Sequence, residues 1–365
     1  MLPSELSRAE VEELARRASG RPDATVTTWS VTSLPVTNLT TGGLARISGL
    51  FADGPAWSLF AKTLRPVEES EAWAVIPEEH HDEVRRELNW LDEPRVYRSG
   101  LTGELPDGLR FPTIVRIDEG ERRLTIWMED VGDEPGWDTD RYRRTARLLG
   151  RLSARCPASR AASELGLGLR PLDRLFHGKI SHLDLVVQAD DGFWRQPSVS
   201  STVDGRYRSD LGRLAELAPS LLQHLHRLPC ALAHGDAAPS NFREPADGST
   251  VALDWSYASI APLGSDLAQL VSGRFESGEA DPATLAEVTG AVLDGYVDGL
   301  RTEGSTVDAG LVEEAFVATL AIRSVFSLLL VERGPGATDE EHGELLRRRA
   351  ALGRYGLDLA LNAAW

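Results

Sequence analysis

Lysine and asparagine are scarce in this chain of 365 residues. The only lysines are Lys62 and Lys179, and the rest of the 39 basic residues are arginines. A lysine that remains in such a chain marks a place that needs a compact point charge rather than a planar fork. Asparagine occurs four times, at Asn38, Asn89, Asn241 and Asn362. An asparagine inside a motif therefore carries extra weight.

Cysteine is equally rare, and long apolar runs are missing. Cys156 and Cys230 are too few for a disulfide framework or a cysteine-rich zinc site. No run of about eighteen uncharged apolar residues occurs, and Met1 to Ala15 lacks a basic head followed by an apolar stretch. We therefore expect a soluble, cytoplasmic protein with no membrane partner.

The balance of charge is strongly acidic. A formal net charge of −17 argues against binding to nucleic acid and is compatible with cationic partners. The length, with 42% hydrophobic residues, allows a substantial core and exceeds the size at which one core usually divides. We expect two lobes, and the sequence does not indicate an oligomeric state.

The first part of the chain has the composition of β-strands. Alternating residues rich in Thr, Val and Trp predict an antiparallel meander of three strands, followed by a helix that is interrupted or restarts near Pro94 and by two further strands. The expected strands are Thr25 to Leu34, Leu44 to Phe51, Trp57 to Leu64, Thr113 to Ile117 and Leu124 to Met128.

The rest of the chain has the periodicity of helices. Glycine and proline between Glu129 and Gly136 mark a lobe boundary, which divides the chain into residues 1–131 and 132–365. Apolar residues then recur at three- and four-residue spacing in several long segments. The predicted fold class is α+β, with an antiparallel sheet in the first lobe and a mostly helical second lobe.

The strongest chemical signal lies between Ala231 and Phe242. An apolar run delivers His234, and a short loop then carries Asp236 and Asn241. A second apolar run ends at Asp254, so the segment predicts a hairpin with polar residues at both ends. One carboxylate can orient a hydroxyl, while an amide oxygen and a second carboxylate can hold a hard cation.

This pattern, His-x-Asp-x-x-x-x-Asn followed by a strand-terminal Asp, resembles the catalytic segment of the aminoglycoside phosphotransferase and choline kinase family. That family has a two-lobed protein-kinase-like fold. Gly235 stands where protein kinases have Arg, as the family allows. The resemblance implies that Asp236 is the catalytic base, that Asn241 and Asp254 bind Mg²⁺, and that ATP or GTP donates the phosphate.

The same resemblance assigns roles in the first lobe. Lys62 ends the third strand, where the lysine of the family contacts the α- and β-phosphates. Its acidic partner is expected on the next helix. Glu93 is our choice because the family often has an acidic residue before a Pro-x-x-Tyr stretch, and Glu87 is the competitor.

Two further segments of the first lobe are predicted to contact the nucleotide. Thr41, Gly42 and Gly43 lie between the first two expected strands, where backbone N–H groups and hydroxyls can face the phosphates. In the linker strand of the family, backbone groups at the positions of Glu129 and Val131 bind the adenine edge. Side-chain identity matters little at those two positions.

The segment from Gly264 to Ala268 resembles the Gly-x-Asp-Leu-Ala helix start of the family. The resemblance implies that Asp266 caps this helix and braces the catalytic loop, and that His234 supports the loop. A plain helix cap is the simpler interpretation of Asp266.

The acceptor is expected to be a small molecule with a hydroxyl group. From Gly264 to Trp365 there are 17 acidic and 8 basic residues, which suits an aminoglycoside or another cationic amine. A kinase of a neutral sugar or another metabolite is the alternative, and a nucleotide-binding pseudokinase scaffold is a third interpretation. The complete set of Lys62, Asp236, Asn241 and Asp254 argues against a pseudokinase.

Overall fold

The computed structural model describes residues 6–36, 38–133, 136–166, 191–325 and 338–365, which belong to two compact units. The first unit comprises Met1–Thr102, Arg110–Asp133 and Arg243–Ser256, and the second comprises Gly103–Leu109, Glu134–Phe242 and Tyr257–Trp365. The expected division at residue 131 places Arg243–Ser256 in the second lobe, whereas the contacts group this hairpin with the first unit.

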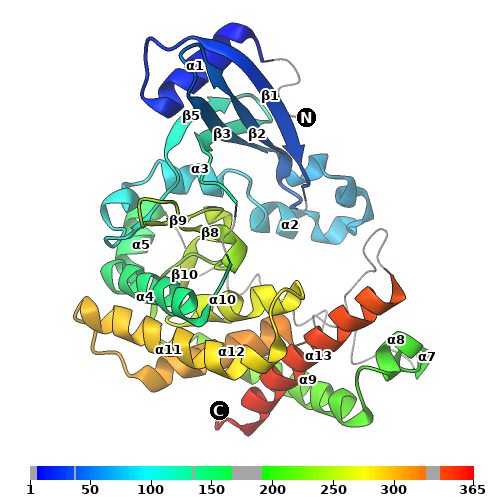
Figure 1. Cartoon of the computed structure of the whole chain (residues 1–365). Helices are drawn as coiled ribbons and strands as arrows, with labels where there is room; N and C mark the ends of the chain where they lie inside the picture. Colours follow the sequence, from blue (N-terminus) through cyan, green and yellow to red (C-terminus); the bar gives the residue numbers. More distant parts are fainter. Residues whose placement is uncertain (1–5, 37, 134–135, 167–190, 326–337) are drawn as a thin grey trace. The chain divides into compact units, whose positions relative to one another are not determined.

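A five-stranded antiparallel sheet, in the order β1-β2-β3-β6-β5, forms the body of the first unit (Figure 1). The strands are β1 (Val26–Leu34), β2 (Thr41–Phe51), β3 (Ala56–Leu64), β5 (Ile114–Glu119) and β6 (Leu124–Glu129). A turn follows Phe51, and β2 and β3 pair along almost their whole length.

The sheet has two different faces because its side chains alternate. Helix α1 (Arg8–Ser19) packs Val11 and Leu14 against Ile47 and Leu59 on one face. A capping box at Ser7 fixes the start of this helix. The opposite face carries Lys62, and Tyr97 of the short helix α3 (Asp92–Tyr97) packs against it; another short helix, α2 (His81–Glu87), precedes α3 in the chain.

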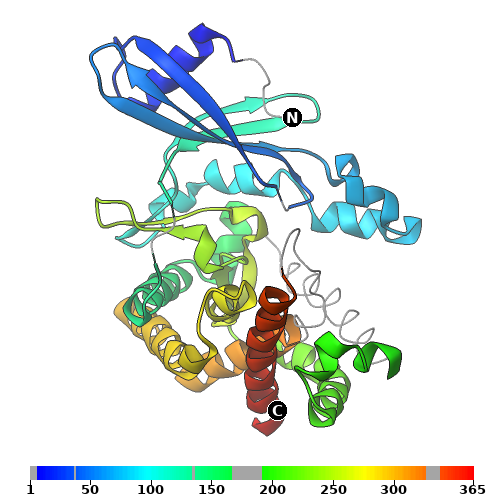
Figure 2. The ribbon, with the colours of Figure 1, turned by 45° about the vertical axis from the view of Figure 1, so that its right-hand side comes forward.

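The second unit is mostly helical (Figure 2). Its helices are α4 (Thr139–Arg155), α5 (Ala158–Leu165), α7 (Asp191–Trp194), α8 (Pro197–Ser200), α9 (Gly205–Leu225), α10 (Ser265–Glu276), α11 (Leu285–Thr302), α12 (Ala309–Ser324) and α13 (Asp339–Asn362). Helices α4 and α11 pack backbone to backbone, and glycines allow this close approach. A Cβ atom at Gly150 would overlap the carbonyl of Tyr296, and one at Gly299 would overlap that of Arg147.

Short strands position the predicted catalytic segment. Strand β7 (Cys230–Ala233) pairs antiparallel with β10 (Ser259–Pro262) and ends directly before His234. Three more strands, β4 (Leu109–Arg110), β9 (Thr250–Ala252) and β8 (Phe242–Arg243), form a small sheet in that order. The predicted α+β class, with an antiparallel sheet followed by a helical region, is confirmed.

Within the described ranges, no helix is long and apolar enough to span a lipid bilayer.

Candidate active site

Lys62 is the centre of a buried ion-pair cluster in the first unit. Its ammonium nitrogen lies 2.7 Å from Glu93 Oε2 and 2.9 Å from Asp254 Oδ1. Strand β3 supplies the lysine, helix α3 supplies Glu93, and Asp254 follows β9. The side chains of Lys62 and Glu93 are 8% and 1% exposed. Lys62 and Glu93 therefore pair away from water, while Asp254, at 27% exposed, joins them from the edge of the cluster.

The electrostatics of the cluster keep the lysine charged. Burial acts to lower the pKa of Lys62, but the carboxylates of Glu93 and Asp254 outweigh it and raise this pKa above its ordinary value. Tyr97, one turn along α3, donates a hydrogen bond of 3.1 Å to Glu93 Oε1. Burial, reinforced by the Glu93 charge, holds the pKa of Tyr97 well above its ordinary value, so the tyrosine stays a donor.

The backbone at Asp254 is unusual. Its φ of 54° lies in the left-handed region, which is uncommon for a residue with a side chain. The fully buried indole of Trp255 anchors this turn, donating to the carbonyl of Ala252 at 2.9 Å. Ser256 Oγ donates to Asp254 Oδ1 at 2.7 Å. Two groups, Lys62 and Ser256, thus fix the orientation of the carboxylate.

The glycine segment differs from the expectation. We expected Thr41, Gly42 and Gly43 between two strands, but they form the start of β2, where Thr41 pairs with Leu64 and Gly43 with Thr63. A register shift separates these two pairs, so Gly42 occupies an irregular position of the ladder.

The physical reason lies just before the strand. The side chain of Asn38 accepts hydrogen bonds from the N–H and hydroxyl of Thr40, both at 3.0 Å. This tight turn completes the reversal early, so pairing resumes at Thr41. A contact of the three residues with phosphate stays a prediction.

The two expected adenine contacts lie at the end of β6. The N–H of Glu129 donates to the carbonyl of Thr113 at 2.9 Å, so this group is already committed. The Glu129 side chain pairs with Arg110. Val131 follows the strand, and the neighbouring Asp130 pairs with Arg46 of β2 at 2.9 Å. Binding of the adenine edge therefore stays a prediction, and the backbone groups that could make this contact are the Glu129 carbonyl and the backbone of Val131.

Asp266 organises the predicted catalytic loop of the second unit. Its two carboxylate oxygens accept hydrogen bonds from the backbone N–H groups of His234 (2.8 Å) and Gly235 (2.9 Å). Burial raises the pKa of Asp266 despite these two donors. We expected Asp266 to cap helix α10, and this was wrong. Gly264 occupies the N-cap position, without a side-chain hydrogen bond. The expected bracing of the loop is present.

Gly235 must be a glycine. Its φ of +80° is a left-handed conformation, and a Cβ atom there would overlap the carbonyl of Tyr257. His234, which is completely buried, accepts the N–H of Asp236 on Nδ1 at 3.3 Å. Gly235 and His234 together turn the chain after the end of β7, and this turn orients Asp236.

Asp236 is held by side-chain amides. Gln269 of α10 donates to Oδ1, and Asn241 Nδ2 donates to Oδ2 at 3.0 Å and to the Asp236 carbonyl at 2.8 Å. Arg323 of α12 approaches Oδ1 at 3.7 Å. The structure therefore brings Asp236 and Asn241 together, and it adds two partners that are distant in the sequence.

The orientation of Asn241 fits a metal ligand. Because its nitrogen faces Asp236, its amide oxygen faces away, and an amide oxygen is a suitable donor for Mg²⁺. In the part of the chain that is described, no group of three or more His, Cys, Asp or Glu side chains could hold a metal ion by itself.

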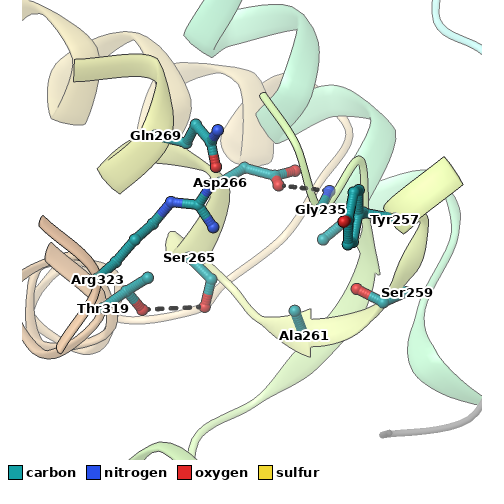
Figure 3. A pocket seen from close by; sticks show the side chains of 10 residues that line it. Gly235, Tyr257, Ser259, Ala261, Ser265, Asp266, Gln269, Thr319 and Arg323 are labelled. Carbon is teal, nitrogen blue, oxygen red and sulfur yellow. Dashed lines mark hydrogen bonds between the residues drawn. The ribbon is translucent and has the colours of Figure 1, made fainter. Parts of the chain in front are cut away.

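A small cavity lies beside this loop (Figure 3). Its volume is about 40 Å³, and all of its lining residues belong to the second unit. Figure 3 shows the guanidinium of Arg323 ending between Gln269 and Ser265. Sequence reasoning missed both Gln269 and Arg323. The helical periodicity of α10 and α12 gave no sign that either side chain reaches Asp236.

The chain matches the model of the phosphotransferase enzyme family (APH) over residues 52–301, which is more than half of its length. This match includes Lys62, Glu93, Asp236, Asn241 and Asp254. It excludes all of β2 and all of α12. No curated protein sequence matches the chain.

Several solved structures share the fold. An aminoglycoside phosphotransferase from Alicyclobacillus acidocaldarius is 14% identical with a TM-score of 0.57, and the alignment covers 99% of this chain and 97% of that one. Choline kinase from Cryptosporidium parvum is 12% identical with a TM-score of 0.52, covering 97% and 95%. A spectinomycin phosphotransferase in complex with ADP and spectinomycin is 11% identical with a TM-score of 0.50, covering 93% of each chain.

At these identities the structural likeness shows the fold alone, whereas the family match rests on the sequence. The expected resemblance is confirmed, and the chain belongs to the phosphotransferase enzyme family of small-molecule kinases.

Proposed function

We propose that this chain transfers the γ-phosphate of ATP or GTP to a hydroxyl group of a small molecule. The buried lysine cluster carries the proposal. Removing Lys62 and Glu93 from water is costly, and a buried ion pair adds little net stability over apolar residues. A phosphotransferase has a use for such a cluster, because an ordered ammonium can bind the phosphates of a nucleotide.

The proposed role of Lys62 follows from its restraints. Glu93 fixes the position of the ammonium, and Tyr97 fixes Glu93 through a hydrogen bond. The Lys62 charge is maintained at all physiological pH values because its pKa is raised. We assign Thr41, Gly42, Gly43, Glu129 and Val131 to nucleotide binding on the resemblance alone.

Asp236 is the proposed general base. Its carboxylate would accept the proton of the acceptor hydroxyl on the oxygen nearest to it. The amide groups of Gln269 and Asn241 restrict rotation of this carboxylate without protonating it. A base held in this way is ready to orient a hydroxyl, which is the main contribution of the protein to a loose phosphoryl-transfer transition state.

Asn241 and Asp254 are the proposed ligands of Mg²⁺. When bound, the ion neutralises negative charge on the transferring phosphates. Two protein oxygens cannot complete its octahedral shell, so nucleotide oxygens and water must supply the rest. Calorimetric titration of the full chain should show weak Mg²⁺ binding that ATP strengthens, and Asp254→Ala should remove most of that coupling. Tight Mg²⁺ binding without nucleotide would contradict this assignment.

An assay of ADP or GDP release tests the function. The full chain would be incubated with Mg²⁺ and ATP or GTP, and with acceptors that include aminoglycosides, choline, neutral sugars and hydroxy acids. We expect release that depends on one class of acceptor, and a phosphorylated product by mass spectrometry. Nucleotide that neither binds nor turns over with any class would refute the proposal.

A further inference from the structure

Arg323 stands out among the residues near Asp236. It lies in the last turn of helix α12, outside residues 52–301 that the family match covers. Its side chain is only 16% exposed, and its nearest carboxylate oxygen, Oδ1 of Asp236, is 3.7 Å away. That distance allows Coulomb attraction and exceeds the length of a hydrogen bond. The guanidinium ends inside the cavity of Figure 3.

The two carboxylates nearest to this cavity already have donors. Asp236 accepts from Gln269 and Asn241, and Asp266 accepts from two backbone N–H groups. A guanidinium has five N–H donors. In the described part of the chain, the Asp236 contact is the one ion pair of Arg323, and no hydrogen bond of its guanidinium occurs. The N–H groups of Arg323 can therefore donate hydrogen bonds to a ligand that carries acceptor atoms.

Other groups in the cavity complete the inventory. The hydroxyls of Ser265 and Thr319 lie 3.5 Å apart, and Ser259 adds a third hydroxyl to the wall. The amide oxygen of Gln269 is buried and, among the described residues, has no hydrogen-bond partner. A ligand that carries an anion for Arg323 and a hydroxyl for Gln269 or Asp236 would satisfy these groups together.

We propose that the acceptor of this enzyme carries an anionic group, a carboxylate or a phosphate, close to the hydroxyl that is phosphorylated, and that Arg323 binds this group. The inference rests on the proposed phosphotransfer. Hydrogen bonds of ordinary length from the hydroxyl to Asp236 and from the anion to Arg323 place the two groups at most about 9 Å apart. Hydroxy acids and small sugar phosphates meet this condition.

The size and charge of the cavity favour this ligand over a cationic amine. A volume of about 40 Å³ holds a few atoms, such as one carboxylate or phosphate group, and not a sugar ring. An ammonium group placed there would meet the positive charge of Arg323. The net charge of −17 is spread over the whole chain and is screened beyond roughly 10 Å, so the nearest charge decides.

The experiment compares matched acceptors in the ADP-release assay with the full chain. Glycerate, gluconate and glycerol 3-phosphate would be tested against glyceramide, glucose and glycerol, with choline and kanamycin as the cationic arm. We expect turnover or calorimetric binding of an anionic member at least tenfold better than of its neutral partner. Preference for a carboxylate or for a phosphate would identify the anion.

Variants of Arg323 test its role. Arg323→Gln should raise KM for the anionic acceptor about ten- to hundredfold, the size of one charge-assisted hydrogen bond, and should change kcat less than threefold. Arg323→Lys should restore part of the affinity. Arg213→Gln on α9, a 58% exposed arginine that pairs with Asp210, is the control and should change neither constant.

Three results would overturn the inference. They are better turnover of a cationic or neutral acceptor, anions that bind Arg323→Gln as tightly as the parent chain, and a fall in kcat at constant KM. The last result would make Arg323 a positioning residue for Asp236. Turnover of choline or kanamycin would refute the anionic acceptor and leave phosphotransfer intact. Anion binding through Arg323 without turnover of any acceptor would refute phosphotransfer and leave the anion site intact.

Discussion

In the first unit the carboxylates of Glu93 and Asp254 are held by an ammonium group, whereas in the second unit the carboxylate of Asp236 is held mainly by two side-chain amides. An ammonium neutralises the charge that it binds. An amide orients a carboxylate and leaves its negative charge in place, which is what a general base requires.

The two regions also differ in how far they are buried. Lys62 and Glu93 are 8% and 1% exposed, while the side chain of Asp236 is 24% exposed, close to the 27% of Asp254. Loss of the Lys62 cation leaves buried charge without a partner, which lowers the free energy of unfolding. Loss of the Asp236 charge leaves a partly solvated amide, so that cost falls on catalysis. The following variants separate the two costs.

Asp236→Asn should have the largest effect, and it should be on turnover. We expect a loss of about a hundredfold or more, because the variant keeps the shape of the side chain and removes the proton acceptor. ATP affinity by calorimetry should stay within about twofold, and the free energy of unfolding should change by less than about 1 kcal/mol. The exposed Asp247 is the control, as Asp247→Asn should keep full turnover. Undiminished turnover of Asp236→Asn with a verified acceptor would remove Asp236 from the mechanism.

Lys62→Met should destabilise the fold as well as impair nucleotide binding. Two carboxylates lose their cation, and the expected loss in the free energy of unfolding is about 3–5 kcal/mol by urea denaturation. Arg85→Met, at a 45% exposed ion pair, should change it by less than about 0.5 kcal/mol. Adding Glu93→Gln to Lys62→Met should recover part of the loss. If Lys62→Met were as stable as the control Arg85→Met, the lysine cluster would not contribute to the stability of the fold.

Gly235→Ala should destabilise the loop by about 3 kcal/mol, because left-handed strain adds to an overlap with the Tyr257 carbonyl. Gly248→Ala is a matched control. Gly248 has nearly the same φ, +78° against +80°, and open space around its Cβ position, so the strain alone should cost about 1 kcal/mol. The difference between the two unfolding free energies measures the overlap. Equal losses would show that the second unit tolerates a shift of the Tyr257 backbone.

Sequence reasoning found the parts of the site that local motifs define. Asp236 and Asn241 lie five residues apart on one short loop, and the rarity of lysine drew attention to Lys62. The order of the first three strands also followed from alternation, because neighbouring strands of a meander pair with each other, whereas the pairing of β6 with β3 was not predicted. Glu93 required the resemblance to a family, since a helical glutamate has no local sign of burial.

The rest depends on contacts that no local pattern encodes. Gln269 and Arg323 reach Asp236 from two helices that are far along the chain, and polar residues on a helix usually face solvent. The start of β2 was misplaced because an Asn38 side chain, rather than glycine content, ends the turn. The helix cap at Asp266 was wrong because buried N–H groups of a neighbouring loop compete for its carboxylate.

Alkaline pH should produce the smallest effect per titrating group, and it bears on both regions. Burial raises the pKa of Tyr97 in the first unit and of Tyr296 in the second, and the Lys62 pKa is also raised. Each group therefore binds its proton more tightly in the folded state than in the unfolded chain. The stability that this supplies is fully present below about pH 10, the ordinary tyrosine value, and is lost as the pH rises further.

Urea denaturation between pH 8 and pH 11 checks this sign. The free energy of unfolding should be nearly constant up to about pH 9.5 and then fall by at most about 1.4 kcal/mol per pH unit for each group. Tyr97→Phe and Tyr296→Phe should each flatten the fall, since a phenylalanine has no proton to lose, although each also loses a hydrogen bond at neutral pH. The partly exposed Tyr355 supplies the control. If the free energy of unfolding of Tyr97→Phe fell as steeply with pH as that of the parent chain, water would reach the lysine cluster. The two units would then differ only in the groups that donate hydrogen bonds to their carboxylates.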